Sequence, residues 1–62
     1  MWIARDKNGE LYLFSEKPSK RENFWMMNSA TTTVIQLPSK LFPEVKWEDE
    51  EPRELVLKPI NK

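Results

Sequence analysis

The sequence predicts an all-β fold: a small antiparallel meander of about four to five short strands, curled into an SH3-like half-barrel, with one short helical turn. Three observations predict it. Residues 31–35 are a β-branched run of the kind that favours strands. Residues 6–9, Asp-Lys-Asn-Gly, are a strong hairpin signal. The five prolines lie between or at the ends of the expected strands, where a sheet tolerates them.

The hairpin joins a strand beginning at Trp2 to a strand over residues 11–14. Asp6 at the first position and Gly9 at the position of positive φ suit a type I turn with a glycine bulge. A two-residue Asn8-Gly9 turn is the alternative, and it would shift every pairing by one residue. The bulged register pairs Trp2 with Phe14, Ile3 with Leu13 and Ala4 with Tyr12. It places Trp2, Tyr12 and Phe14 on one face, and Ile3, Leu11 and Leu13 on the other.

The middle of the chain alternates between polar and apolar segments. Residues 15–22 are polar and predict a loop, in which Ser19 and Glu22 match a capping box. Residues 24–27 and 31–37 predict two further strands. Pro38 and Pro43 then interrupt the sheet, so the pair Leu41-Phe42 is expected in a short turn that closes one end of it.

The end of the sequence predicts the last strand and its packing. In residues 53–58, Leu55 and Leu57 point to one side. Val45 and Trp47 alternate with charged residues, a brief signal with the period of a strand. We therefore predict that Trp47 closes the core against Val45 and, across the sheet, Leu55 or Leu57. Its replacement by alanine would then cost on the order of 3 to 5 kcal/mol.

Composition excludes several classes of function. The 62 residues suffice for one small domain, residues 1–62, with ten basic and ten acidic residues. Without cysteine or histidine the chain lacks the ordinary ligands of zinc and the usual base for a nucleophile, so we expect no metal, no cofactor and no enzymatic activity. The charges near Met1 leave no room for a signal peptide, which predicts a cytoplasmic protein without a membrane span.

Two groups of residues are candidates for binding. The acidic run Glu48, Asp49, Glu50 and Glu51 is either a solvated loop or a docking site for a basic protein partner, and it lacks the spacing of a calcium loop. The basic residues Lys17, Lys20 and Arg21 precede Trp25, a combination that can hold single-stranded nucleic acid. Zero net charge favours the alternative that Trp25 belongs to the core, so nucleic acid is not the expected partner.

The two apolar faces of the hairpin predict a homo-oligomer, most simply a two-fold dimer. One small core can bury one face, and neither the polar loop, the acidic run nor the Leu41-Phe42 turn looks large enough to cover the other. The strand over residues 31–37 is uncharged and would pair with its own copy if it lay at an edge. The expected interface contains Trp2, Tyr12, Phe14 and Val34. A closed barrel with scattered surface aromatics is the alternative. The sequence thus predicts a non-enzymatic interaction or structural module.

The stretch LPSKLFPEVKWEDEEP, the strand RELVLK that follows it and the opening WIARDKNG resemble a pattern in small uncharacterised bacterial proteins, some of them associated with prophages or mobile elements. The similarity covers most of the chain. It implies that the domain spans the whole sequence, and it assigns no activity and no functional residue.

Overall fold

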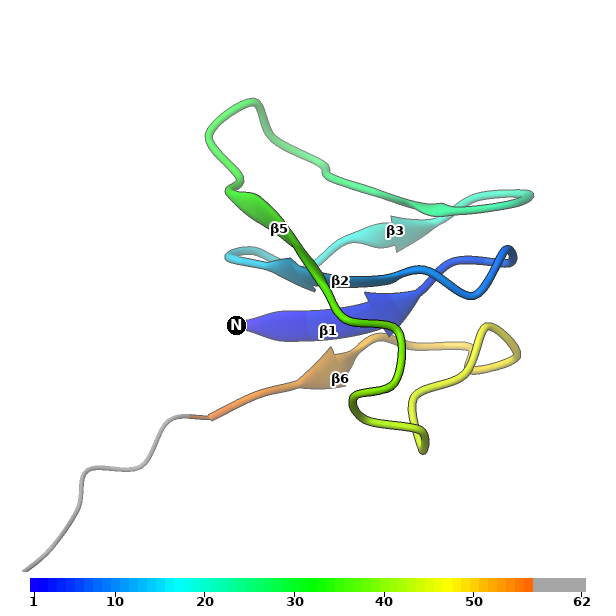
Figure 1. The fold of residues 1–62 in the computed structure, drawn as a ribbon. Helices are drawn as coiled ribbons and strands as arrows, with labels where there is room; N and C mark the ends of the chain where they lie inside the picture. The colour runs from blue at the N-terminus through cyan, green and yellow to red at the C-terminus, as the bar shows by residue number, and fades with distance from the viewer. Residues whose placement is uncertain (57–62) are drawn as a thin grey trace, which may run out of the picture.

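The computed structural model describes residues 1–56 and confirms the all-β class (Figure 1). Within that range six short strands pair antiparallel in two sheets. The main sheet has the order β5-β2-β1-β6, and β3 pairs with β4 in the second sheet. The strands are β1 (Trp2–Arg5), β2 (Leu11–Phe14), β3 (Ser19–Lys20), β4 (Trp25–Met26), β5 (Val34–Leu37) and β6 (Arg53–Glu54).

The hairpin of β1 and β2 has the bulged register, one of the two that the sequence allows. Trp2 pairs with Phe14, Ile3 with Leu13 and Ala4 with Tyr12. The amide of Gly9 donates to the Asp6 carbonyl at 2.9 Å, and the amide of Asp6 donates to the Glu10 carbonyl at 2.8 Å. Gly9 adopts a φ of 94°, a conformation that a side chain would disfavour. The local chemistry of residues 6–9 therefore sets the register of the two central strands.

Several expected elements differ from those observed. The strands expected at 24–27 and 31–37 shorten to β4 and β5, and the last strand shortens to β6, with Leu57 outside the described residues. Residues 15–22 contain β3 rather than only a loop, so Ser19 pairs in a sheet instead of capping a helix. Residues 1–56 contain no helix. Leu41 and Phe42 lie in turns instead, and Phe42 has a positive φ of 49°.

Both faces of the hairpin are covered by the same chain, which corrects the expectation that a second chain is needed for this. On one face, Val45 is buried with Ile3 and Leu11, and Phe42 packs beside them. On the other face, Trp25 is buried with Ala4 and Phe14. Trp2, Tyr12 and Trp47 pack around this second cluster.

Two of the predicted neighbours of Trp47, Val45 and Leu55, are wrong, and the third, Leu57, lies outside the described residues. Its indole is half-buried and lies edge-on to that of Trp25, with ring centroids 6.5 Å apart. Val45 belongs to the cluster on the opposite face of the sheet, together with Leu55. The reason is that residues 45–49 form turns instead of a strand, so alternate residues do not share a face.

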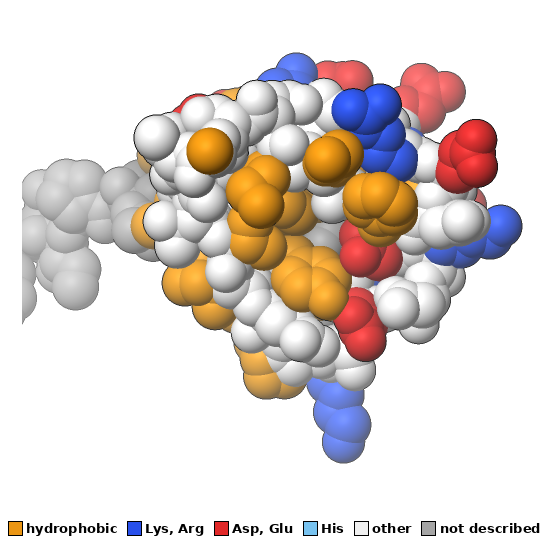
Figure 2. Space-filling model, turned by 90° about the horizontal axis from the view of Figure 1, so that it is seen from above, with side chains coloured by type: hydrophobic (Ala, Val, Ile, Leu, Met, Phe, Trp, Pro, Cys, Tyr) orange, Lys and Arg blue, Asp and Glu red, His pale blue; other side chains and the backbone are white. Residues whose placement is uncertain are grey.

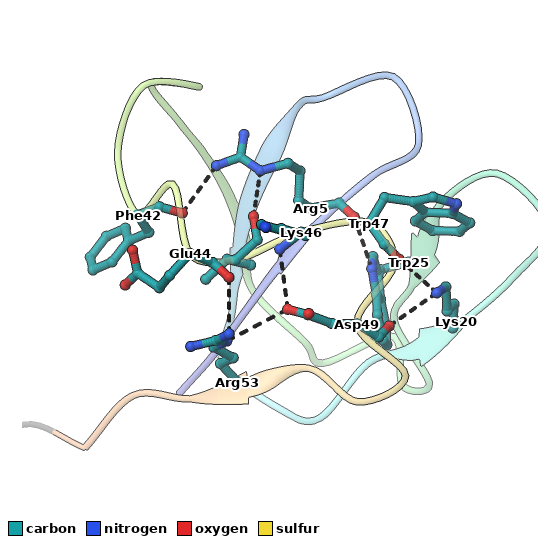
Figure 3. A network of polar contacts seen from close by, with 10 residues as sticks. Arg5, Lys20, Trp25, Phe42, Glu44, Lys46, Trp47, Asp49 and Arg53 are labelled. Atoms are coloured by element: carbon teal, nitrogen blue, oxygen red, sulfur yellow. Dashed lines mark hydrogen bonds and ion pairs between the residues drawn. The ribbon is translucent and has the colours of Figure 1, made fainter.

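Basic side chains hold the connecting segment, residues 38–52, against the sheet (Figure 3). The Arg5 guanidinium donates five hydrogen bonds, which use its full set of N–H groups. Four of the acceptors are carbonyls of the connecting segment: those of Ser39, Leu41, Phe42 and Val45. Lys20 donates to the carbonyls of Trp47 and Asp49, and Arg53 donates to that of Glu44. These cations replace the ladder bonds that an irregular segment lacks.

Candidate functional site

The acidic run is partly occupied by the chain's own cations. Glu48, Glu50 and Glu51 are exposed, and Glu51 lies 3.0 Å from Lys17 Nζ. Asp49 is half-buried, where its Oδ2 accepts the Lys46 amide at 3.1 Å and lies 3.5 Å from Arg53 Nε. Residues 1–56 hold no group of three or more acidic side chains placed to bind a metal ion. Asp49 therefore has a structural role, and within residues 1–56 Glu48 and Glu50 are the members of the run that form no ion pair.

The basic residues that precede Trp25 do not surround an exposed ring. Trp25 is 6% exposed, and its indole Nε1–H donates to the Arg5 carbonyl at 3.0 Å. Lys20 Nζ lies 4.3 Å from the centroid of the Trp47 ring and 5.8 Å from that of Trp25. Lys17 pairs with Glu51 and lies over Trp2, and Arg21 is exposed. Trp25 thus offers little ring surface for a base to stack on.

The four residues expected at an oligomer interface differ in how far they are exposed. Phe14 is buried at 2% exposure, Trp2 and Tyr12 are half-buried, and Val34 is exposed. Val34 begins β5, which is an outer strand of the main sheet and pairs only with β2. Val34, Ile35 and Gln36 are all exposed, so the free edge of β5 is open to solvent.

The register of β5 identifies the backbone groups at this free edge. Ser15 N–H donates to the Thr33 carbonyl at 3.0 Å, so Thr33 faces β2. In an antiparallel ladder alternate residues bond to the same neighbour, and Ile35 and Leu37 therefore also face β2. The N–H and C=O groups of Val34 and Gln36 consequently point away from β2, outward from the edge of the sheet.

A second feature is an apolar hollow of about 270 Å³ on the face covered by β3 and β4 (Figure 2). Figure 2 shows hydrophobic side chains grouped around it, with acidic side chains at one side. Phe14 and Trp25 are its buried members, and Asp6 contributes a carboxylate. The remaining lining residues are Tyr12, Phe24, Met26, Met27 and Val34.

Asp6 has an unusual environment for a carboxylate. Its Oδ1 accepts the Trp25 backbone amide at 2.9 Å. Burial raises the pKa of Asp6 above its ordinary value; the Trp25 amide opposes this shift, and the nearby Glu10 carboxylate adds to it. Glu10 in turn accepts a hydrogen bond from the Tyr12 hydroxyl, which also raises the pKa of Tyr12. The hollow therefore combines aromatic walls with the Asp6 carboxylate, which the Glu10 carboxylate repels from outside the lining.

Sequence reasoning did not find the hollow or the role of Arg5. The exposed Phe24, Met26 and Met27 gave the only local signal for the hollow, as an apolar segment beside a polar one. No local sequence signal indicated the role of Arg5, because its acceptors in the connecting segment lie 34 to 40 residues away along the chain. The strand at the free edge was easier to recognise in the sequence, because it lies within residues 23–39, which carry no charge.

Comparison with known proteins adds no relationship: no family model, curated protein or solved structure matches this chain. In the part of the chain that the structure describes, no helix is long and apolar enough to cross a membrane.

Proposed function

We propose that this protein is a non-enzymatic interaction module that acts as a homodimer, with the two copies joined edge to edge through β5. The observation that carries the proposal is the free edge of β5, four uncharged residues of which three are exposed. Proteins usually protect such an edge with charge, proline or a bulge, because an unprotected edge pairs with another strand.

Apolar side chains on both sides of β5 support the same proposal. Val34 is 38% exposed and lines the hollow beside Phe14, whereas Ile35 is 51% exposed on the opposite face. Ile35 also borders a second cavity of about 230 Å³ with Met1 and Leu13. A strand added at this edge would cover apolar surface on both faces at once.

The proposed partner strand is β5 of a second copy, centred on Ile35. In this register Val34 of each chain bonds to Gln36 of the other, so all four outward-facing groups of each chain are used. The two Ile35 side chains then lie directly opposite each other at a pair without hydrogen bonds, where side chains are closest. A register centred on Gln36 would need the Pro38 carbonyl, which already accepts the Leu41 amide. A register centred on Val34 would need the Thr32 amide, which already donates to Ser29.

Single cysteines test this register directly, because the chain contains no cysteine of its own. In the proposed dimer the Cα atoms at position 35 lie roughly 4.5 Å apart across the two-fold axis. This separation suits a disulfide. Ile35→Cys should therefore form a covalent dimer under mild oxidation, visible on a non-reducing gel.

Val34→Cys is the matched control, since Val34 is exposed on the same strand. Two copies of position 34 lie diagonally, about 7 to 8 Å apart, which is too far for an unstrained disulfide. Equal cross-linking of the two variants, or none with Ile35→Cys, would contradict the proposed dimer.

A further inference from the structure

We propose that the apolar hollow beside β5 binds a trimethylammonium group, with Asp6 supplying the opposite charge. The walls carry the first part of this inference. Tyr12 and Phe24 line it with their more exposed aromatic rings, and Phe14 and Trp25 complete the lining with 2% and 6% exposure. Aromatic faces attract cations through their quadrupole, and rings grouped around a hollow are the usual means of recognising quaternary ammonium groups.

The carboxylates carry the second part. Asp6 lines the hollow, and Glu10 is close enough to raise the Asp6 pKa by repulsion. Neither of them forms an ion pair within residues 1–56. A cation in the hollow would offset the repulsion between the two carboxylates, whereas a neutral ligand of the same shape would leave it in place.

The protein already holds its own cations against aromatic rings in this way. Lys20 Nζ lies over both Trp47 and Trp25, and Lys17 Nζ lies 5.6 Å from the Trp2 ring centroid. Lys20 also needs acceptors for its N–H groups, and it finds them in the carbonyls of Trp47 and Asp49.

The lining of the hollow explains why a methylated cation suits it better than a primary ammonium. Apart from Asp6 and Tyr12, the lining side chains are Phe, Trp, Met and Val, which offer no strong acceptor. A primary ammonium would therefore lose hydrogen bonds to water on entering. A trimethylammonium group has no N–H donor, and its methyl groups can pack against the exposed Phe24, Met26 and Met27.

The test compares choline with 3,3-dimethylbutan-1-ol, its neutral analogue of the same shape, by titration of the ¹⁵N-labelled protein. Choline should shift the backbone resonances of residues 24–27 and change the Trp25 side-chain signal, at concentrations at which the alcohol has little effect. Equal responses to the two compounds, or no response to choline at millimolar concentration, would overturn the inference.

Two variants assign the binding to these side chains. Asp6→Asn keeps an acceptor for the Trp25 amide and should weaken choline binding at least about threefold. Phe24→Leu keeps an apolar rim and should weaken it about fivefold through loss of the cation–aromatic contact. Glu48→Gln removes an exposed carboxylate elsewhere and should leave choline binding unchanged. Unchanged binding in both hollow variants would contradict the assigned site.

A short peptide containing trimethyllysine distinguishes the source of the group. Tighter binding of the peptide than of choline would identify a methylated protein, and the reverse would identify a small molecule. The hollow borders the proposed dimer edge only through Val34, whereas Ile35 lies on the opposite face of the sheet. The Ile35→Lys variant leaves the lining side chains of the hollow unchanged and should therefore still bind choline.

Discussion

The two outer strands of the main sheet differ in length, charge and surroundings. β6 has only two residues, Arg53 and Glu54, both charged, and it follows the buried Pro52. β5 has four residues, none charged, and its first three are exposed. Short length, charge and proline are the features that prevent an edge from pairing with another chain. One edge of this sheet is thus protected, and the other lacks all three features along its length.

The connecting segment joins β5 to β6. Releasing this segment from the sheet is the change for which we expect the largest effect. Arg5 lies in β1, beside β6 and away from β5, and it holds residues 38–52 through their carbonyls. Arg5→Ala would leave these carbonyls without their donors. We expect a loss on the order of 3 to 5 kcal/mol in the free energy of unfolding, measured by urea denaturation.

Arg5→Lys is the control for charge in this experiment. Lysine keeps the positive charge but has three donors at a single nitrogen, so it cannot reach carbonyls from Gly9 to Val45 at once. Its stability should fall between that of the wild type and that of Arg5→Ala. A lysine variant as stable as the wild type would show that charge, and not the fork of N–H groups, holds the segment.

Proline at position 36 would protect the free edge of β5 against pairing, as Pro52 does next to β6. The Gln36 amide points away from β2, so Gln36→Pro removes no bond within the chain but removes two bonds from the proposed dimer. We expect a monomer with a thermal midpoint close to that of the wild type at low concentration.

Ile35→Pro is the matched comparison, because the Ile35 amide faces β2. It should cost about 1 to 3 kcal/mol, since it removes a ladder hydrogen bond inside the chain and leaves the acceptor on β2 without its donor. If Gln36→Pro destabilised the chain as strongly as Ile35→Pro, the assignment of outward and inward groups along β5 would be wrong.

The smallest change in stability is expected for a substitution of Asp6, which lines the same hollow as Val34. The folded-state pKa of Asp6 is raised above 3.8, so the folded protein binds its proton more tightly than the unfolded chain. Stability is therefore lost as pH rises from 3.8 through the raised pKa. Asp6→Asn removes this loss and keeps the acceptor for Trp25, so it should be more stable than the wild type at neutral pH.

Urea denaturation of both proteins at several pH values measures this difference. The advantage of Asp6→Asn should shrink as pH falls and disappear below about 3.8, where Asp6 is protonated in both states. An advantage that persisted unchanged at low pH would have to arise from something other than the charge of Asp6.

The fold could be predicted where local chemistry decides it. Residues 6–9 limit the hairpin to two registers, of which the structure has the bulged one, and in either register strand alternation places Trp2 and Ile3 on opposite faces. The connecting segment could not be predicted, because it is held by cations that donate to backbone carbonyls far along the chain. Trp47 is an example of a prediction that failed for this reason. Strand-like alternation predicted that it packs beside Val45, whereas in the structure turns place it on the other face of the sheet, against Trp25.

The candidate site was predicted in part for the same reason. An uncharged β-branched strand can be recognised in the sequence, and it includes Val34. Its place at the edge depends on the pairing of β5 with β2 and of β6 with β1, both of which join distant parts of the chain. The hollow depends on the short pairing of β3 with β4, which presents Trp25 to the sheet and leaves Phe24 at the rim.

Sedimentation equilibrium at micromolar concentration tests the account most directly, on the wild type and on Ile35→Lys. The substitution places two like charges opposite each other at the proposed two-fold axis, while the exposed position leaves the monomer's core intact. Val56→Lys, at another exposed apolar residue, is the control. The account predicts twice the 7.4 kDa chain mass for the wild type and the control, and the single chain mass for Ile35→Lys. A wild type that sediments as a monomer, or an Ile35→Lys variant that remains a dimer, would contradict it.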